Sequence, residues 1–280
     1  MIPVHRTNIM LTPDKARVLI RPFFPFDKPQ IQLVVGRILS LTEHQVRREL
    51  KTIVKSFADR HFQIEKIFQQ RFETARKYLI SDVALSHERQ LLVGAYFTSE
   101  YSLECAALFN PSMIPHPDQS GLPEGALRFV MSLRAVGEGH VSSIEFREGV
   151  ISPDYRIHIT APSRFAVSNE PDGNAVYDKE LFSQWVYEIG MENDYVKRVL
   201  SELPEPFTLH DLQRAVAGVA DRAPKLSQTN RFARDNLLWL AQANYQFTFT
   251  SDLPLSARVL FPQSRNESKG IEDARFVRLT

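Results

Sequence analysis

Two acids and a base lie close together in the stretch 270–275, which reads GIEDAR, near the end of the 280-residue chain. Asp273 and Arg275 are two positions apart, so they share a face if the stretch forms a strand. A general acid in glycoside cleavage is a carboxyl that still holds its proton near neutral pH, and the charges and burial around it decide that state. Here the neighbours include Glu272. The alternative is an ion pair on the surface of a strand, which contributes little free energy.

Two earlier positions carry polar side chains at the ends of apolar runs. Asn110 follows the run 106–109 and precedes Pro111, so it lies where a strand ends. Its amide can donate and accept hydrogen bonds, which suits a sugar hydroxyl, although the same residue also suits the start of a turn. Arg134 ends the run 127–134, where a buried guanidinium needs a partner. That partner is either a hydroxyl-rich or anionic ligand or a carboxylate of the protein.

The residues that precede these strands predict helices. Apolar side chains recur at helical spacing through residues 29–97. Thr42 with Gln45 is typical of a capping box, and Ser86 is typical of a helix N-cap. The basic side of this region has no interleaved aromatic residues, so we expect a solvated face and no nucleic-acid site.

The first residues predict a small hairpin. Residues 7–11 and 17–23 have strand-like composition and flank a turn that contains Pro13 and Asp14.

Near residue 98 the pattern changes to short apolar runs separated by turns that contain Pro and Gly. Because no helical segments separate these runs, we expect them to pair as antiparallel strands. The runs are 103–109, 127–134, 141–147 and 155–160.

A second helical block, at about 175–244, interrupts the strands, and Thr208 with Asp211 is typical of a helix cap. Strands are expected to return at 245–250, 257–261 and 274–279. The predicted fold class is therefore α+β. Residues 1–97 form one domain of N-terminal strands and helices, and residues 98–280 form a β part with a helical insertion.

Composition excludes several classes of protein. The chain is 43% hydrophobic and 24% charged with a net charge of +1, so no overall field favours nucleic acid or a membrane surface. The single cysteine excludes an internal disulfide framework and a cysteine-based zinc site, and no metal or nucleotide motif is present. No signal peptide or membrane span is recognisable, so a cytoplasmic protein is expected.

The three polar stretches, taken as a set, resemble glycoside hydrolase family 130, the β-mannoside phosphorylases and β-mannosidases built on a five-bladed β-propeller. The matching residues are Phe109–Ser112, Ser132–Arg134 and 270–275, within about 100–150 and 255–280. Ala274 stands where the family usually has Pro. The resemblance implies that the β part is the first blades of a propeller, interrupted by the helical insertion, and that the chain is the N-terminal portion of a larger member.

The resemblance also implies roles for the matching residues. Asp273 would be the general acid of an inverting reaction on β-mannosidic bonds, and Glu272 is an accompanying acid. Asn110 and Arg134 would bind the mannosyl unit, and Arg275 would position and polarise the acid. No cofactor is implied, but inorganic phosphate would be a co-substrate in a phosphorylase. The groups that hold phosphate or activate water come later in the family's fold, so this chain alone is expected to be inactive.

Two other functions stay open. The chain is alternatively a carbohydrate-binding or oligomerisation module without catalysis, in which the helical regions mediate homo-oligomers. A third alternative is a helical scaffold in which Asp273 and Arg275 form a plain surface ion pair. The expected partner in the leading hypothesis is a manno-oligosaccharide or another mannoside.

Overall fold

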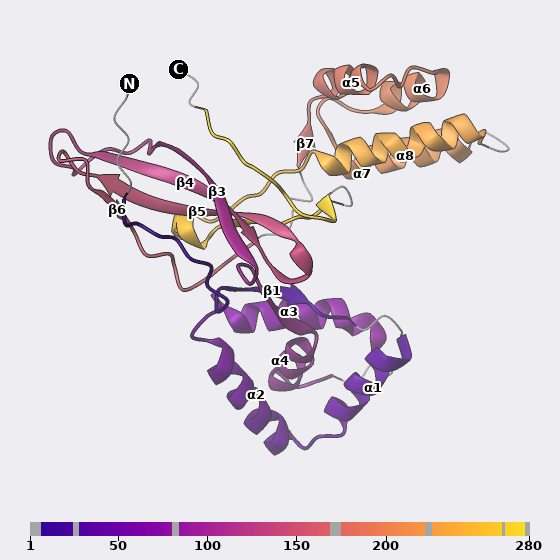
Figure 1. Ribbon diagram of the computed structural model, residues 1–280. Coiled ribbons are helices and arrows are strands. Elements are labelled where there is room, and N and C mark those ends of the chain that lie inside the picture. The colour runs from indigo at the N-terminus through magenta and orange to yellow at the C-terminus, as the bar shows by residue number, and fades with distance from the viewer. Residues whose placement is uncertain are drawn as a thin grey trace. The chain divides into compact units, whose positions relative to one another are not determined.

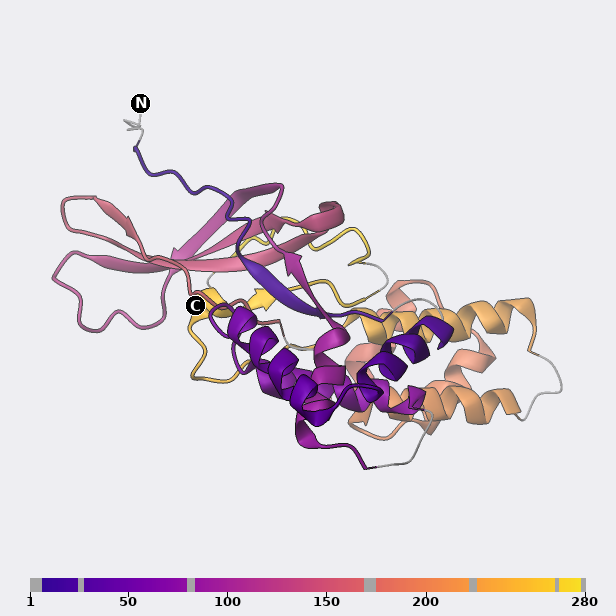
Figure 2. The same cartoon turned by 90° about the horizontal axis from the view of Figure 1, so that it is seen from below.

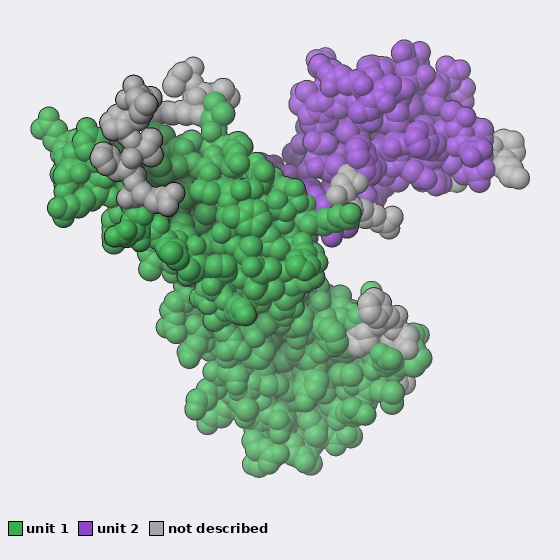
Figure 3. Space-filling view, viewed as in Figure 1, with its two compact units in different colours: residues 1–168, 251–262, 269–280 green, residues 169–250, 263–268 purple. Residues whose placement is uncertain are grey.

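The computed structural model describes residues 7–24, 28–79, 84–168, 175–221, 226–264 and 267–277. The chain divides into two compact units, coloured separately in Figure 3. Unit 1 comprises residues 1–168, 251–262 and 269–280, and unit 2 comprises residues 169–250 and 263–268. Both helices and strands are present, which confirms the α+β class.

The expected domain boundary at residue 97 lies inside unit 1, and the expected helical insertion at about 175–244 lies inside unit 2. An independent domain of residues 1–97 stays a prediction.

The N-terminal half of unit 1 is helical, as its apolar spacing predicts. Its elements are α1 (Lys28–Leu39), α2 (Glu43–Phe57), α3 (Ile64–Ala75), the short 3-10 helix η1 (Arg76–Tyr78) and α4 (His87–Tyr96). Thr42 and Gln45 form the expected capping box at α2, and the Ser86 hydroxyl caps α4. The apolar faces meet in one core around α4, where Phe68, Leu92, Val93 and Phe97 are fully buried.

Two close contacts hold this helical core together. Gly94 of α4 lies against the backbone of Phe68 in α3, where a Cβ atom would be 1.8 Å from the Phe68 carbonyl oxygen. Arg89 is buried and donates to the carbonyl oxygens of Ile38 (2.5 Å) and Leu41 (2.7 Å) and to Glu43 (2.7 Å). It therefore satisfies carbonyl groups at the C-terminal end of α1.

The hairpin expected at residues 7–23 is wrong in its first half. Residues 7–11 are not a strand. The other strand exists as β1 (Val18–Pro22), but its antiparallel partner is β2 (Thr98–Ser102), far along the chain. In this ladder Val18 pairs with Ser102 and Pro22 pairs with Thr98. The sequence of β2, TSEYS, has no apolar alternation, so only the folded helices between the two strands bring this partner into place.

The main sheet is antiparallel and follows the helical half of unit 1 in the chain. Its strands run β3, β4, β5, β6, with β9 also paired to β5 beside Ile144 and Glu145. Figures 1 and 2 show β3, β4 and β5 as long neighbouring arrows. The strands are β3 (Ala107–Pro115), β4 (Leu127–Val136), β5 (Ser142–Ile151), β6 (Ile157–Ile159) and β9 (Val259–Leu260), with the 3-10 turns η2 (Glu138–His140) before β5 and η3 (Leu255–Ala257) before β9.

The expected runs from residue 103 to residue 160 thus all contain strands, and the run at 257–261 contains β9. The strand expected at 245–250 is absent, because these residues are irregular. The described part of the expected strand 274–279, residues 274–277, is irregular as well, and residues 278–279 lie outside the described residues. In the described residues the sheets stay open, with no closed barrel or propeller.

Strand β5 is buried on both faces from Ser142 to Arg147. On one face, Glu145 and Arg147 join Arg17 and Glu104 in a buried group of two acids and two bases. Arg147 Nη2 lies 2.6 Å from Glu104 Oε1, and Arg17 also donates to the Ser256 carbonyl at 2.5 Å. Burial and the nearby Glu145 raise the pKa of Glu104. Opposite charges within the group offset part of the cost of its removal from water.

Unit 2 is a helical body with a two-stranded ribbon, and its core contains Phe182, Leu212 and Leu237. Thr208 and Asp211 form the expected cap, with Asp211 N donating to Thr208 Oγ1 and Thr208 N donating to Asp211 Oδ2. The elements are β7 (Val176–Tyr177), α5 (Lys179–Glu188), α6 (Asp194–Glu202), β8 (Phe207–Thr208), α7 (Leu209–Asp221) and α8 (Gln228–Ala243).

Candidate functional site

A segment of residues 269–277, here called the C-terminal strap, crosses one face of the main sheet. It begins at a parallel bridge between Gly270 and Ser142, where Ile271 N donates to the Ser142 carbonyl at 2.9 Å. Gly270 has φ +108°, and a Cβ atom there would lie 2.2 Å from the Ser142 nitrogen. Only glycine suits both this backbone conformation and this close approach.

The other end of the strap is held by Phe276. Its ring stacks on Phe146 at 6.3 Å between centroids, and its backbone N–H donates to Ser112 Oγ at 3.0 Å. Between the two ends, the buried Ser132 hydroxyl lies 3.4 Å from the carbonyl oxygens of both Ser112 and Ala274. The strap is therefore fixed at both ends and in its middle to β3, β4 and β5.

A β-bulge in β3 brings the asparagine to the strap. Phe109 pairs with Arg134 and Ser112 pairs with Ser132, so β3 advances three residues while β4 advances two. The extra residue lets Phe109 and Ser112 face the same side. Asn110 adopts a left-handed backbone at the bulge (φ 52°), and its Nδ2 donates to Asp273 Oδ1.

Arg134 binds both acids of the strap. Its Nη2 donates to Glu272 Oε1, and its Nη1 lies 3.8 Å from Asp273 Oδ1. Its Nε donates to Ser142 Oγ at 3.0 Å, and the guanidinium carbon lies 5.1 Å from the centre of the Phe109 ring. The guanidinium side chain is 18% exposed, whereas Glu272 and Asp273 are 60% and 50% exposed. Arg134 is therefore the more buried partner, and the carboxylates of Glu272 and Asp273 are the more exposed ones.

Arg275 does not take the place expected for it. Asp273 has φ 47° and the strap is irregular, so residues 273 and 275 do not share a strand face. Arg275 Nη1 donates to the Asn110 carbonyl at 3.2 Å, and in the described residues it makes no ion pair with Asp273. The cation beside Asp273 is Arg134, so the alternative of a surface ion pair between Asp273 and Arg275 is not found among the described residues.

All five residues singled out in the sequence, Asn110, Arg134, Glu272, Asp273 and Arg275, thus come from three distant stretches to one place in unit 1. Their chemical roles stay predictions. Sequence reasoning assigned no role to the hydroxyl groups of Ser112, Ser132 and Ser142, although Ser112 and Ser132 lie within the matching stretches. Serines at strand positions are common, and only the folded register places these three on the face that meets the strap.

The arrangement can hold a polyhydroxylated ligand. Asp273 Oδ1 is tied to Asn110, whereas its Oδ2 has no hydrogen-bond partner among the residues that the structure describes. That oxygen and the exposed Glu272 carboxylate can accept from hydroxyl groups or transfer a proton. Over the described ranges no group of three His, Cys, Asp or Glu side chains could hold a metal ion. No helix among them is long and apolar enough to cross a membrane.

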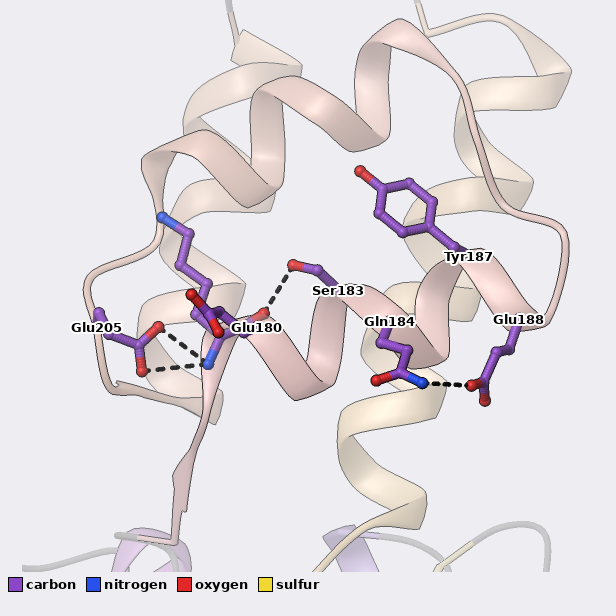
Figure 4. Close-up of a pocket in the computed structure, with 7 residues that line it drawn as sticks. Glu180, Ser183, Gln184, Tyr187, Glu188 and Glu205 are labelled. Carbon is purple, nitrogen blue, oxygen red and sulfur yellow. Dashed lines mark hydrogen bonds between the residues drawn. The ribbon is translucent and has the colours of Figure 1, made fainter.

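A separate pocket of about 710 Å³ lies on unit 2, along the polar side of α5. Figure 4 shows its lining side chains, most of which come from one helix. Several of them are hydrogen-bonded to their surroundings. For example, Lys179 Nζ donates to the Leu203 carbonyl (2.7 Å) and Gln184 donates to Glu188 (2.9 Å). The lining residues are Lys179, Glu180, Ser183, Gln184, Tyr187, Glu188 and Glu205. None of the residues singled out in the sequence lies there.

Compared with known protein families, with curated proteins and with solved structures, the chain shows no match.

Proposed function

We propose that this chain carries part of the active site of an inverting β-mannoside phosphorylase or β-mannosidase. The observation that supports the proposal is the convergence of Asn110, Arg134 and Asp273. In the sequence they belong to three stretches that resemble glycoside hydrolase family 130, and Asn110 and Asp273 are 163 positions apart. The sheet β3–β6 would be a blade of the family's propeller, with Asn110 on its first strand.

In this proposal Asp273 is the general acid. Asn110 and Arg134 contact its Oδ1, so Oδ2 is the oxygen proposed to donate to the leaving group. An inverting glycosidase needs such a fixed carboxyl and a nucleophile on the opposite face of the sugar. Inorganic phosphate would be that nucleophile in a phosphorylase, and water would be in a hydrolase. Glu272 is the accompanying acid.

Arg134 and Asn110 would bind the mannosyl unit through the donors that the acids leave unused. Arg275 is proposed to act indirectly, because its hydrogen bond to the Asn110 carbonyl supports the bulge that presents the Asn110 amide. This position replaces the direct contact with the acid that the sequence suggested.

The test is to incubate the full-length gene product with manno-oligosaccharides, with and without inorganic phosphate. Release of mannose 1-phosphate supports a phosphorylase, and release of mannose alone supports a hydrolase. Asp273→Asn keeps the shape of the side chain and removes the acid, so turnover is expected to fall by about a hundredfold or more. If neither product forms, the enzyme function is wrong.

A binding module without catalysis is the second candidate. The half-exposed Asp273 and Glu272 favour it, because both carboxylates are open to solvent. Binding of mannobiose without any product, and with affinity lost in Asn110→Ala, would select this function.

A further inference from the structure

Ser142 contacts both Arg134 and the C-terminal strap of the proposed site. It is fully buried at the start of β5, on the same face as Ile144 and Phe146. Its hydroxyl accepts from Arg134 Nε at 3.0 Å, while its carbonyl accepts from Ile271 N at 2.9 Å. One residue thus contacts both the arginine and the strap that carries the acids.

The contact at Nε has a geometric consequence. A guanidinium is a rigid planar fork, so a hydrogen bond at Nε together with one at Nη2 fixes the plane of the whole group. The Phe109 ring lies against the same guanidinium and limits it from another side. Without the hydrogen bond that Arg134 Nε donates to Ser142, the long side chain of Arg134 regains rotamers, and ordering them again costs free energy.

We propose that Ser142 is a positioning residue of this site. Its hydroxyl orients Arg134 toward Glu272 and Asp273, and its backbone sets where the strap begins. The inference rests on the proposed function for the identity of the ligand, but the orientation of Arg134 by Ser142 can be tested without any ligand.

The neighbouring Ser143 provides a matched control. It is buried on the same strand, on the opposite face, and its hydroxyl has no hydrogen-bond partner within the described part of the chain. Ser143→Ala therefore removes the same atom from the same strand without touching Arg134. Ser142→Ala removes the hydroxyl that Arg134 uses but keeps the backbone bridge to the strap.

The experiment compares wild type, Ser142→Ala, Ser142→Thr and Ser143→Ala. The first measurement is the ¹⁵N NMR signal and hydrogen exchange of the Arg134 Nε–H group. The second is the affinity for mannobiose by calorimetry. Nε–H exchange is expected to speed up in Ser142→Ala alone, and affinity to fall by about tenfold to a hundredfold in that variant. Ser142→Thr retains a hydroxyl and is expected to restore slow exchange.

Unchanged Nε–H exchange in Ser142→Ala would overturn the proposal, whatever the ligand. So would a loss of affinity of equal size in Ser142→Ala and Ser143→Ala, since that result reflects general loosening of β5. If wild type does not bind mannobiose, the proposed ligand is wrong, and the exchange measurement alone then decides the role of Ser142.

Discussion

Asn110 and Asp273 meet with both backbones in the left-handed region, at φ 52° and φ 47°, and the amide of one donates to the carboxylate of the other. Few residue types other than glycine adopt this region without strain, and Asn and Asp are the two that do so most readily. The same pair of residue types thus satisfies the backbone at both positions and makes the contact between them.

Two substitutions at Asn110 separate these contributions. Asn110→Gly loses the hydrogen bond to Asp273 but tolerates the backbone, whereas Asn110→Ala loses the bond and also places a Cβ in the left-handed region. We expect Ala to be less stable than Gly by about 1 kcal/mol. Urea unfolding measures the difference, and equal stabilities would show that the bulge relaxes around the new residue.

The attachment of the strap depends on Gly270. Gly270→Ala brings a Cβ atom onto the backbone of Ser142 at a φ of +108°, so we expect the bridge to open. Amide exchange at Ile271 and Phe276 should then accelerate, with β4 unaffected. Gly121→Ala is the control, because Gly121 also has a positive φ (71°) but has no atom within 4 Å of the new Cβ. Acceleration of the same amides in the control would contradict the steric explanation.

Two Gly→Ala substitutions in the helical half of unit 1 are expected to change the stability of the protein in opposite directions. Gly94→Ala forces apart α3 and α4 at the Phe68 carbonyl and is expected to cost about 3 kcal/mol or more. Gly36→Ala in α1 meets no atom within 4 Å and is expected to stabilise the protein by up to about 1 kcal/mol through helix propensity. Thermal unfolding of both variants checks the prediction, which fails if both change stability in the same direction.

A buried histidine makes the stability of unit 1 depend on pH. Burial lowers the pKa of His61 below its usual 6.5, although the contact with Glu100 opposes this shift. Burial alone raises the pKa of Glu100, but hydrogen bonds from Arg60 and His61 outweigh it and bring the pKa below 4.5. Both groups bind fewer protons in the folded state than in the unfolded state.

The free energy of unfolding should therefore fall as pH falls, first below about 6.5 through His61 and then below about 4.5 through Glu100. His61→Gln removes the titrating group and retains a donor toward Glu100, so the first decline should flatten while the second remains. Urea unfolding at a series of pH values measures both. If the free energy of unfolding of the variant still falls as steeply as that of wild type between pH of about 7.5 and 5.5, groups other than His61 cause this decline.

Local signals predicted local structure well. The caps at Thr42, Ser86 and Thr208 need only neighbours three residues away, and β4 is marked by a largely apolar run. The partner of β1 and the contacts of Ser142 depend on residues that lie far away in the sequence, so no local pattern encodes them. The error at Arg275 has one cause, the assumption that residues 273–275 form a strand, which the left-handed Asp273 rules out.

The two buried faces of β5 bear on which substitutions the protein tolerates. From Ser142 to Arg147 one face supports the strap and the other holds the buried charges of Glu145 and Arg147, so no position in that run points to water. Along β3, in contrast, exposed and half-buried positions alternate from Phe109 to Pro115. A saturation mutagenesis scan should find that every position from Ser142 to Arg147 in β5 tolerates few substitutions. In β3, positions that tolerate many substitutions and positions that tolerate few should alternate.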